Sequence, residues 1–187
     1  MKPYKKLQEM TLEELWHLFP ITLAPHRTEW ITIAREEIAL LRNILSLFSP
    51  EINHIGSTAI PAIQAKPIVD ILVTVPPESD FARMKHSMES AGYICMSENC
   101  RRMSFNKGYT PEGYAENVFH IHIHMHDDDN EIIFRDYLLT HHDTAKEYEA
   151  LKQKLSIQYR YDRDGYTKAK TEFIRHIVKM AKENDGK

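Results

Sequence analysis

The segment that most constrains this chain is a nearly continuous apolar run over residues 67–75 that carries one carboxylate, Asp70. Side chains alternate between the two faces of an extended strand, so Asp70 shares a face with Ile68, Leu72 and Thr74. Both faces are otherwise mostly apolar, as in a central strand covered on both sides. Burying an unpaired carboxylate there would cost on the order of several kcal/mol. Asp70 is therefore expected at an opening, in an ion pair, at a backbone cap or at a metal ion.

A turn of small residues, Gly56-Ser57-Thr58, precedes this strand by about a dozen residues. The turn follows a short predicted strand, and it presents backbone N–H groups and hydroxyls that suit a phosphate. Phosphoryl- and nucleotidyl-transfer sites place a metal-binding carboxylate beside such a turn, because Mg²⁺ is held partly by the protein and partly by substrate phosphates. The spacing therefore favours a phosphate site next to a metal ligand.

The remaining pattern predicts a mixed sheet with one inserted helix, followed by a helical C-terminal third. We expect an α/β (α+β) fold with an N-terminal extension (1–27), an α/β core (28–128) and a helical C-terminal part (129–187) in one structural unit. Helices are expected at 11–18, 28–48, 79–91, 131–140, 143–158 and 166–183, and strands at 51–55, 67–75, 93–97, 102–107 and 117–125.

The composition argues against several classes of function. The formal net charge is −3 with His counted neutral, so the chain lacks the basic excess of a nucleic-acid-binding protein. No apolar run approaches the ~20 residues of a membrane helix. The N-terminus has no signal-peptide core, and Cys95 and Cys100 are too few for a disulfide framework. We expect a soluble cytoplasmic protein that acts on a small molecule or nucleotide, without a membrane or nucleic-acid partner.

A histidine strand supplies further candidates. His120, His122 and His124 alternate with apolar residues, which places all three imidazoles on one face. Neighbouring side chains on that face are about 7 Å apart, close enough to share a metal. One interpretation is a site in which His122 and His124 join Asp70 to bind Zn²⁺ or Mn²⁺. The other is a half-exposed strand whose histidines contact solvent, a phosphate or an acid, or act in proton transfer.

Several basic residues could bind the phosphates of a substrate. Lys66 lies just before the Asp70 strand, and Arg102 and Lys107 border another predicted strand. With the Gly-Ser-Thr turn, these three form the expected phosphate-binding set. The pattern around Arg101 and Lys170 is more typical of solvated charges.

The motifs together resemble the GrpB family of the nucleotidyltransferase superfamily. The resemblance covers about residues 28–180 in order. It is carried by "HIGSTAIPAIQAKPIVDILV" (54–73), "RRMSFNKG" (101–108), "FHIHIH" (119–124), "FRDYLLTHHDTAKEYEALKQKL" (134–155) and "DRDGYTKAKTEFI" (162–174).

The resemblance implies a polymerase-β-like core, a short mixed sheet flanked by helices. In that superfamily a Gly-Ser turn binds a nucleoside triphosphate, two carboxylates on the next strand hold two metal ions, and a later strand adds a third carboxylate. Gly56 and Ser57 match the turn, and Asp70 matches the first carboxylate. Leu72 stands at the second position, and the later strand carries histidines.

The expected function is metal-dependent nucleotidyl or phosphoryl transfer to a small molecule. The expected cofactor is a divalent metal, Mg²⁺ or Mn²⁺ with Zn²⁺ as an alternative, and a nucleoside triphosphate is the expected substrate. Leu72 leaves open whether the chain is an enzyme. The alternatives are a non-catalytic module that binds a nucleotide or phosphometabolite, and a metalloenzyme centred on Asp70, His122 and His124. Carboxylates that could complete a metal site are Glu51, Glu112 and Glu116.

Overall fold

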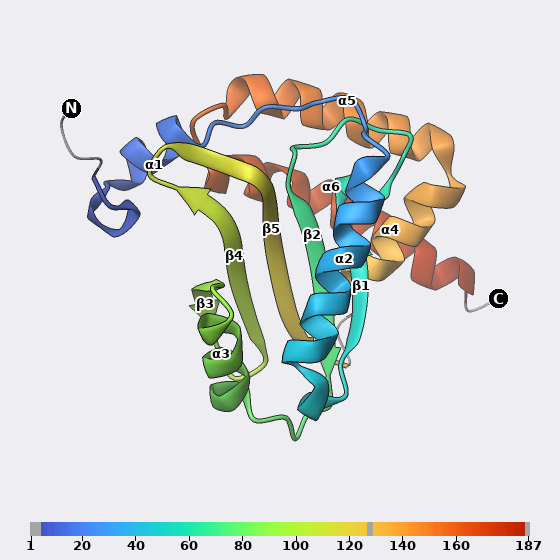
Figure 1. The fold of residues 1–187 in the computed structure, drawn as a ribbon. Coiled ribbons are helices and arrows are strands. Elements are labelled where there is room, and N and C mark those ends of the chain that lie inside the picture. Colours follow the sequence, from blue (N-terminus) through green and yellow to red (C-terminus); the bar gives the residue numbers. More distant parts are fainter. Residues whose placement is uncertain (1–4, 127–128, 186–187) are drawn as a thin grey trace.

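A five-stranded mixed sheet organises the fold, with helices on both faces (Figure 1). The structure, a computed structural model, describes residues 5–126 and 129–185. The spatial order of the strands is β1-β2-β5-β4-β3. Only the central pair, β2 and β5, is parallel among the described strands. The strands are β1 (Glu51–Ile55), β2 (Val69–Val75), β3 (Ile94–Glu98), β4 (Arg102–Thr110) and β5 (Gly113–Met125).

The helices form two groups that lie on opposite faces of this sheet (Figure 1). One group lies on the core face and consists of α2 (Glu29–Ile44) and α3 (Phe81–Ser90). The short helix α1 (Leu12–Leu18) lies outside both groups, near the end of the β4–β5 hairpin (Figure 1), and its His17 ring stacks on the Tyr161 ring. The second group is C-terminal: α4 (Asn130–Thr140), α5 (His142–Gln158) and α6 (Arg163–Asp185). None of the helices within the described ranges is long and apolar enough to cross a membrane. This mixed sheet with flanking helices confirms the expected fold class.

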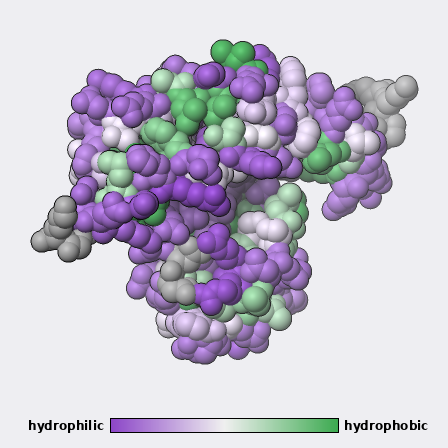
Figure 2. All heavy atoms as spheres, turned by 180° about the vertical axis from the view of Figure 1, so that it is seen from behind, coloured by the Kyte–Doolittle hydropathy of each residue, from purple (hydrophilic) through white to green (hydrophobic). Residues whose placement is uncertain are grey.

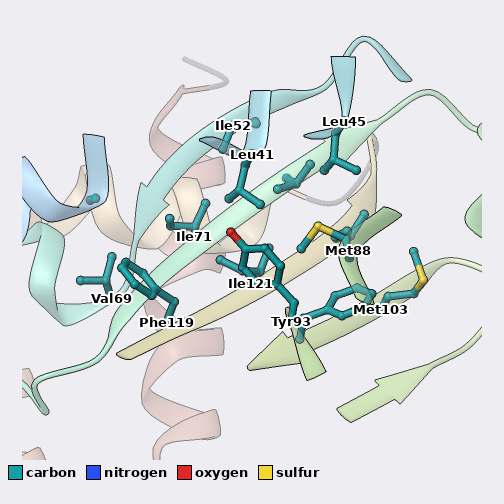
Figure 3. Packing of buried hydrophobic residues seen from close by; sticks show 14 of the residues in the cluster. Leu41, Leu45, Ile52, Val69, Ile71, Met88, Tyr93, Met103, Phe119 and Ile121 are labelled. Atoms are coloured by element: carbon teal, nitrogen blue, oxygen red, sulfur yellow. The ribbon is translucent and has the colours of Figure 1, made fainter. Parts of the chain in front are cut away.

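The main apolar core lies between the sheet and α2 and α3 (Figure 3). Ile71, Phe105 and Ile121 from three strands meet Leu41 of α2 and Met88 of α3, and all five are fully buried. Each such side chain stabilises the fold by about 1.5–3 kcal/mol relative to an exposed one. The strand alternation predicted for β2 is confirmed. Val69, Ile71, Val73 and Val75 face this core, whereas Asp70 faces the other way.

A second core attaches the C-terminal helices to the segment that follows the Gly-Ser-Thr turn. Ile60 and Ile63 of that segment pack among Leu138 of α4, Tyr148 of α5 and Ile177 of α6. The contact brings the polar side chains of α5 and α6 to the turn and to the neighbouring end of β2. Residues far apart in the sequence thereby meet on the sheet face that carries Asp70.

The hairpin between β4 and β5 is longer than the sequence predicted. Both strands extend past the expected limits and pair as far as Thr110 and Gly113. Gly108 sits at an irregularity in this pairing with φ +90°, and a Cβ there would lie 2.2 Å from the Asn117 carbonyl oxygen. Only glycine accepts both the backbone angle and the contact, so the strand continues where an ordinary residue would end it.

Candidate functional site

Asp70 lies directly against the Gly-Ser-Thr turn. A Cβ added at Gly56, whose φ is +71°, would lie 2.6 Å from the Asp70 Oδ2 atom. Glycine is therefore needed at this position both for the backbone angle and for the close approach. The Asp70 side chain is 29% exposed, so it sits at an opening rather than in the core. The Gly-Ser-Thr turn and the strand-borne carboxylate are side by side, as their spacing predicted.

Two histidines of β5 complete a cluster with Asp70. The Oδ1 atom of Asp70 lies 3.2 Å from His120 Nδ1 and 3.7 Å from His122 Nε2. Within the described residues, these three form the one group of His, Cys, Asp and Glu side chains whose ligand atoms could converge on a metal, all within 4.8 Å of one another. The strand face and His122 agree with the sequence analysis, but His120 takes the place in the cluster that was expected for His124.

The register of the parallel pair explains this difference. Asp70 is the partner of His120 in the β2–β5 ladder. His124 lies four residues further along β5, which is about 13 Å at 3.3 Å per residue. Its buried imidazole instead has Nδ1 4.0 Å from the Glu131 carboxylate of α4. His124 is therefore not brought to Asp70.

The protonation of the cluster follows from its contacts. Burial raises the pKa of Asp70, but hydrogen bonds from His120 and His122 outweigh burial and hold that pKa well below its usual range. Burial lowers the pKa of His120, against the attraction of Asp70. At neutral pH the carboxylate is ionised and the His120 imidazole is neutral, and both are then in the form that can bind a metal.

Tyr109 and Arg163 hold His120 on the side of its ring that is remote from Asp70. The Tyr109 hydroxyl and His120 Nε2 are 2.6 Å apart and share a hydrogen bond. Arg163 of α6 donates to the Tyr109 oxygen over 2.8 Å and to the Tyr114 oxygen over 3.0 Å. These contacts fix the ring orientation of His120 and place the Arg163 cation against the tyrosine that His120 contacts.

Lys152 of α5 joins the Gly-Ser-Thr turn to the segment that follows it. Its ammonium group donates to the Ser57 hydroxyl over 2.9 Å and also to the Gln64 carbonyl oxygen. Glu149, one turn earlier, accepts the Gln64 N–H over 2.6 Å. The Lys152 side chain is only 2% exposed, and its burial lowers the pKa to about 7. The sequence analysis missed Lys152, although it lies in the family-like block 134–155.

Two further lysines lie close to the Tyr166 ring. Lys66 Nζ is 5.4 Å and Lys170 Nζ is 4.3 Å from the ring centroid. Burial, together with the neighbouring cations, lowers the pKa of Lys66 to about 7, and burial lowers that of Lys170 to about 8. Lys66 thus lies where the sequence placed it, whereas Lys170 is half-buried in the site and is not a solvated charge. Arg163 and Lys152 contribute to the same positive field.

The third residue of the turn supports the fold around the site. Thr58 is 1% exposed, and its hydroxyl lies 2.9 Å from His54 Nε2 and donates to the Ile68 carbonyl over 3.4 Å. Burial lowers the pKa of His54 to about 4, so His54 is neutral in this contact. The Thr58 side chain therefore joins β1 to the start of β2 and leaves Ser57 to face the site.

Two of the expected phosphate-binding residues lie elsewhere. Lys107 pairs with Phe119 in the β4–β5 ladder, which puts it on the core face, and it donates to both carboxylate oxygens of Glu37 over 2.8 and 3.1 Å. Arg102 is exposed at the far end of β4, opposite His124. Neither residue is brought to Asp70 or Ser57.

The position of the second metal carboxylate is closed. Leu72 is fully buried between Asn53 of β1 and His122 of β5. Glu51, Glu112 and Glu116 are outside the Asp70 cluster within the described residues. The residues present therefore do not fit a site that holds two metal ions between three carboxylates, but they do fit one ion held by a carboxylate and two imidazoles.

The cluster opens to solvent on the face opposite the main core. His122 is 34% exposed and Asp70 is 29% exposed. Seen from the back of Figure 1, the surface is hollowed between the upper and the lower part of the molecule, with hydrophilic and some hydrophobic residues around the hollow (Figure 2). A small polar ligand could therefore reach the metal-capable group without a rearrangement of the core.

The chain also matches a known protein family and several of its members in sequence. Residues 20–180 match the family described as GrpB protein. The chain is 34% identical to the glutamate-rich protein GrpB of Alkalihalophilus pseudofirmus, covering 84% of this chain and 94% of that protein. It is 32% identical to the UPF0157 protein YqkA of Bacillus subtilis, covering 95% of this chain but only 52% of that longer protein.

A solved structure of a GrpB protein has the same fold as this chain. The crystal structure of the conserved protein GrpB from Enterococcus faecalis superposes with a TM-score of 0.74 at 28% identity, over 89% of this chain and all (100%) of that chain. A weaker likeness, with a TM-score of 0.46 at 13% identity, links 77% of this chain to 42% of the Cid1 poly(U) polymerase. That second value is too low to support an argument about function.

Proposed function

The chain belongs to the GrpB protein family, and on this premise we propose that it binds a nucleotide by its phosphates and transfers a nucleotidyl or phosphoryl group to a small molecule. The observation that carries the proposal is the contact between the Gly56 turn and Asp70, with His120 and His122 beside the carboxylate. This juxtaposition puts a phosphate site and a metal site within one opening.

The basic side chains provide the phosphate site. Lys66, Lys152, Lys170 and Arg163 concentrate positive charge in a half-buried space, where Asp70 attracts Lys66 and Lys170 and Glu149 attracts Lys152. Burying like charges is unfavourable unless an anion compensates them. A polyphosphate would supply that compensation, and Lys152 would reach it beside the Ser57 hydroxyl to which it is bonded.

Asp70, His120 and His122 are the residues that would hold the metal ion. A divalent ion in this position supplies Lewis-acid stabilisation of the charge that develops on phosphoryl oxygens. The residues themselves orient the reactants: Tyr109 and Arg163 fix His120, Gly56 allows the turn to approach, and the half-exposed His122 leaves a side from which an acceptor would enter.

The test is a turnover screen of nucleoside triphosphates with Mg²⁺, Mn²⁺ or Zn²⁺ and a set of small-molecule acceptors. Asp70→Asn should lower turnover by at least ~100-fold, the effect expected on losing a group that stabilises charge in the transition state. Glu116→Gln, which changes an exposed carboxylate of β5 outside the cluster, should leave turnover unchanged. Equal turnover in the wild type and Asp70→Asn would refute the proposal.

Leu72 favours one second candidate, a module that binds nucleotides or phosphometabolites without catalysis. The buried leucine removes the carboxylate that the two-metal mechanism needs, while the cationic phosphate site stays complete. Calorimetry with ATP, GTP and coenzyme A precursors separates the two candidates. Binding that depends on Lys152, without turnover under any metal condition, would support the non-catalytic module.

A further inference from the structure

We propose that Asp70, His120 and His122 form a single-ion site that selects a first-row transition metal such as Zn²⁺ over Mg²⁺. The inference concerns the same opening as the proposed function and rests on it for the ion's role in transfer, but the metal preference itself follows from the ligands. It departs from the carboxylate-rich, two-metal arrangement that the superfamily implies.

The distances suit one ion. Metal–ligand distances of about 2.0–2.2 Å and ligand–metal–ligand angles between about 90° and 110° put neighbouring ligand atoms about 3.0–3.5 Å apart. The observed separations from Asp70 Oδ1 are 3.2 Å to His120 Nδ1 and 3.7 Å to His122 Nε2. Small side-chain adjustments are enough to place an ion between all three atoms.

The ligand types decide the preference. Imidazole nitrogens suit zinc, iron, nickel and copper, whereas Mg²⁺ binds oxygen ligands and keeps most of its water. A pair of histidines with one carboxylate offers Mg²⁺ a single protein oxygen donor group. Since Leu72 is buried beside the cluster, no oxygen donor arises from that position. The replacement of carboxylates by histidines therefore shifts the site away from Mg²⁺.

The second ring nitrogen of His120 has the kind of oxygen partner that metal-binding histidines usually have. Ligating histidines typically bond their second ring nitrogen to an oxygen, which orients the ring. Here His120 Nε2 lies 2.6 Å from the Tyr109 hydroxyl, which Arg163 also contacts. Tyr109 is thus assigned as a positioning residue. Three protein ligands on a half-exposed site leave further coordination positions for water or a substrate oxygen.

The experiment uses the full chain without a histidine tag, freed of metal with a chelator, and titrated with Zn²⁺, Mn²⁺ and Mg²⁺ in the absence of nucleotide. Calorimetry should give one ion per chain, with Zn²⁺ tightest, Mn²⁺ weaker and Mg²⁺ at least ~100-fold weaker than Zn²⁺. The visible spectrum of Co²⁺ bound to the protein should report nitrogen and oxygen ligation. Circular dichroism and thermal unfolding check that each variant is folded.

Variants identify the ligands. Asp70→Asn, His120→Asn and His122→Asn should each weaken Zn²⁺ binding by more than the about 10–100-fold expected for losing an outer partner, and Tyr109→Phe should fall within that range. His86→Asn removes an exposed histidine of α3 and should change nothing. His124→Asn should leave the Co²⁺ spectrum unchanged, because His124 lies beside Glu131.

Mg²⁺ binding as tight as Zn²⁺ binding, or a Zn²⁺ affinity unchanged in His122→Asn, would overturn the inference. A Zn²⁺ affinity that falls equally in His86→Asn and His122→Asn would also overturn it, since it would indicate scattered surface binding. Nucleotide turnover does not enter these measurements. A zinc-selective protein without turnover would uphold the metal site and count against the proposed reaction.

Discussion

The two faces of the sheet both bury charged groups, but only one of them compensates the charge internally. On the core face, Glu37 accepts hydrogen bonds from Tyr93 over 2.5 Å and from Lys107, whose ammonium also lies 4.8 Å from the centre of the Tyr93 ring. On the other face, Lys66, Lys152 and Lys170 all have lowered pKa values, although Asp70 attracts Lys66 and Lys170 and Glu149 attracts Lys152. Asp70 also contacts two histidines, His120 and His122.

The difference separates structural charge from functional charge. A buried ion pair whose partners satisfy each other is a structural feature. A half-buried excess of one sign, next to an opening and a metal-capable cluster, is what the proposed phosphate site consists of. Substitutions on each face should therefore have different effects on stability and on ligand binding.

The largest expected effect comes from breaking the compensated pair. Glu37→Leu leaves the Lys107 ammonium without its carboxylate, and we expect a loss of about 3 kcal/mol in the free energy of unfolding, at the low end for buried pairs because Lys107 is 32% exposed. Chemical denaturation measures this loss. The double variant Glu37→Leu with Lys107→Met should recover most of it. A double variant as unstable as the single one would show that the loss comes from packing and not from charge.

A smaller effect is expected from the glycine that joins the turn to Asp70. Gly56→Ala imposes a side chain at φ +71° and 2.6 Å from the Asp70 carboxylate. Such strain costs on the order of 1–3 kcal/mol. Metal binding should weaken as well, because Asp70 must move. Gly92→Ala is the matched control, since φ there is +87° but a Cβ would meet nothing within 4 Å. Equal loss of metal binding in both variants would contradict the role given to the close approach.

The smallest effect is a pH dependence of stability. The pKa of Lys152 is about 7 in the folded protein and near its usual 10.5 in the unfolded chain. Between these values the unfolded chain binds a proton that the folded protein has lost, so folding becomes more stable as pH rises. The contribution between pH 7 and 8 is about 1 kcal/mol. Denaturation at both pH values should show a rise that is about 1 kcal/mol smaller in Lys152→Met. An identical rise in both proteins would show that Lys152 is fully charged in its buried position.

The sequence determined much of this site in advance because its strongest signals are local. Strand alternation separated Asp70 from the face of Ile71, the cost of burying a lone carboxylate predicted an opening or a partner for Asp70, and the spacing put the small-residue turn beside it. The same alternation, applied to the strand that contains Lys107, would have placed that lysine on the core face with Met103 and Phe105.

Other features could not be predicted from local pattern. Which histidine meets Asp70 depends on the register between β2 and β5, two strands separated by a helix and two further strands. Lys152 reaches the turn, and Lys170 the surroundings of Asp70, only because an apolar core fixes α5 and α6 against the segment after the turn. Their charge in the sequence resembles that of any solvated helix face, so only the tertiary packing distinguishes them.

The most direct measurement is a calorimetric titration of inorganic tripolyphosphate, a probe with no base, into the metal-free full chain. The wild type should bind it, Lys152→Met should bind it about 10–100-fold more weakly through loss of a charge-assisted hydrogen bond, and Lys154→Met, an exposed lysine of the same helix, should match the wild type. Equal affinity in all three proteins, or no binding by the wild type, would contradict the assignment of the uncompensated face as a phosphate site.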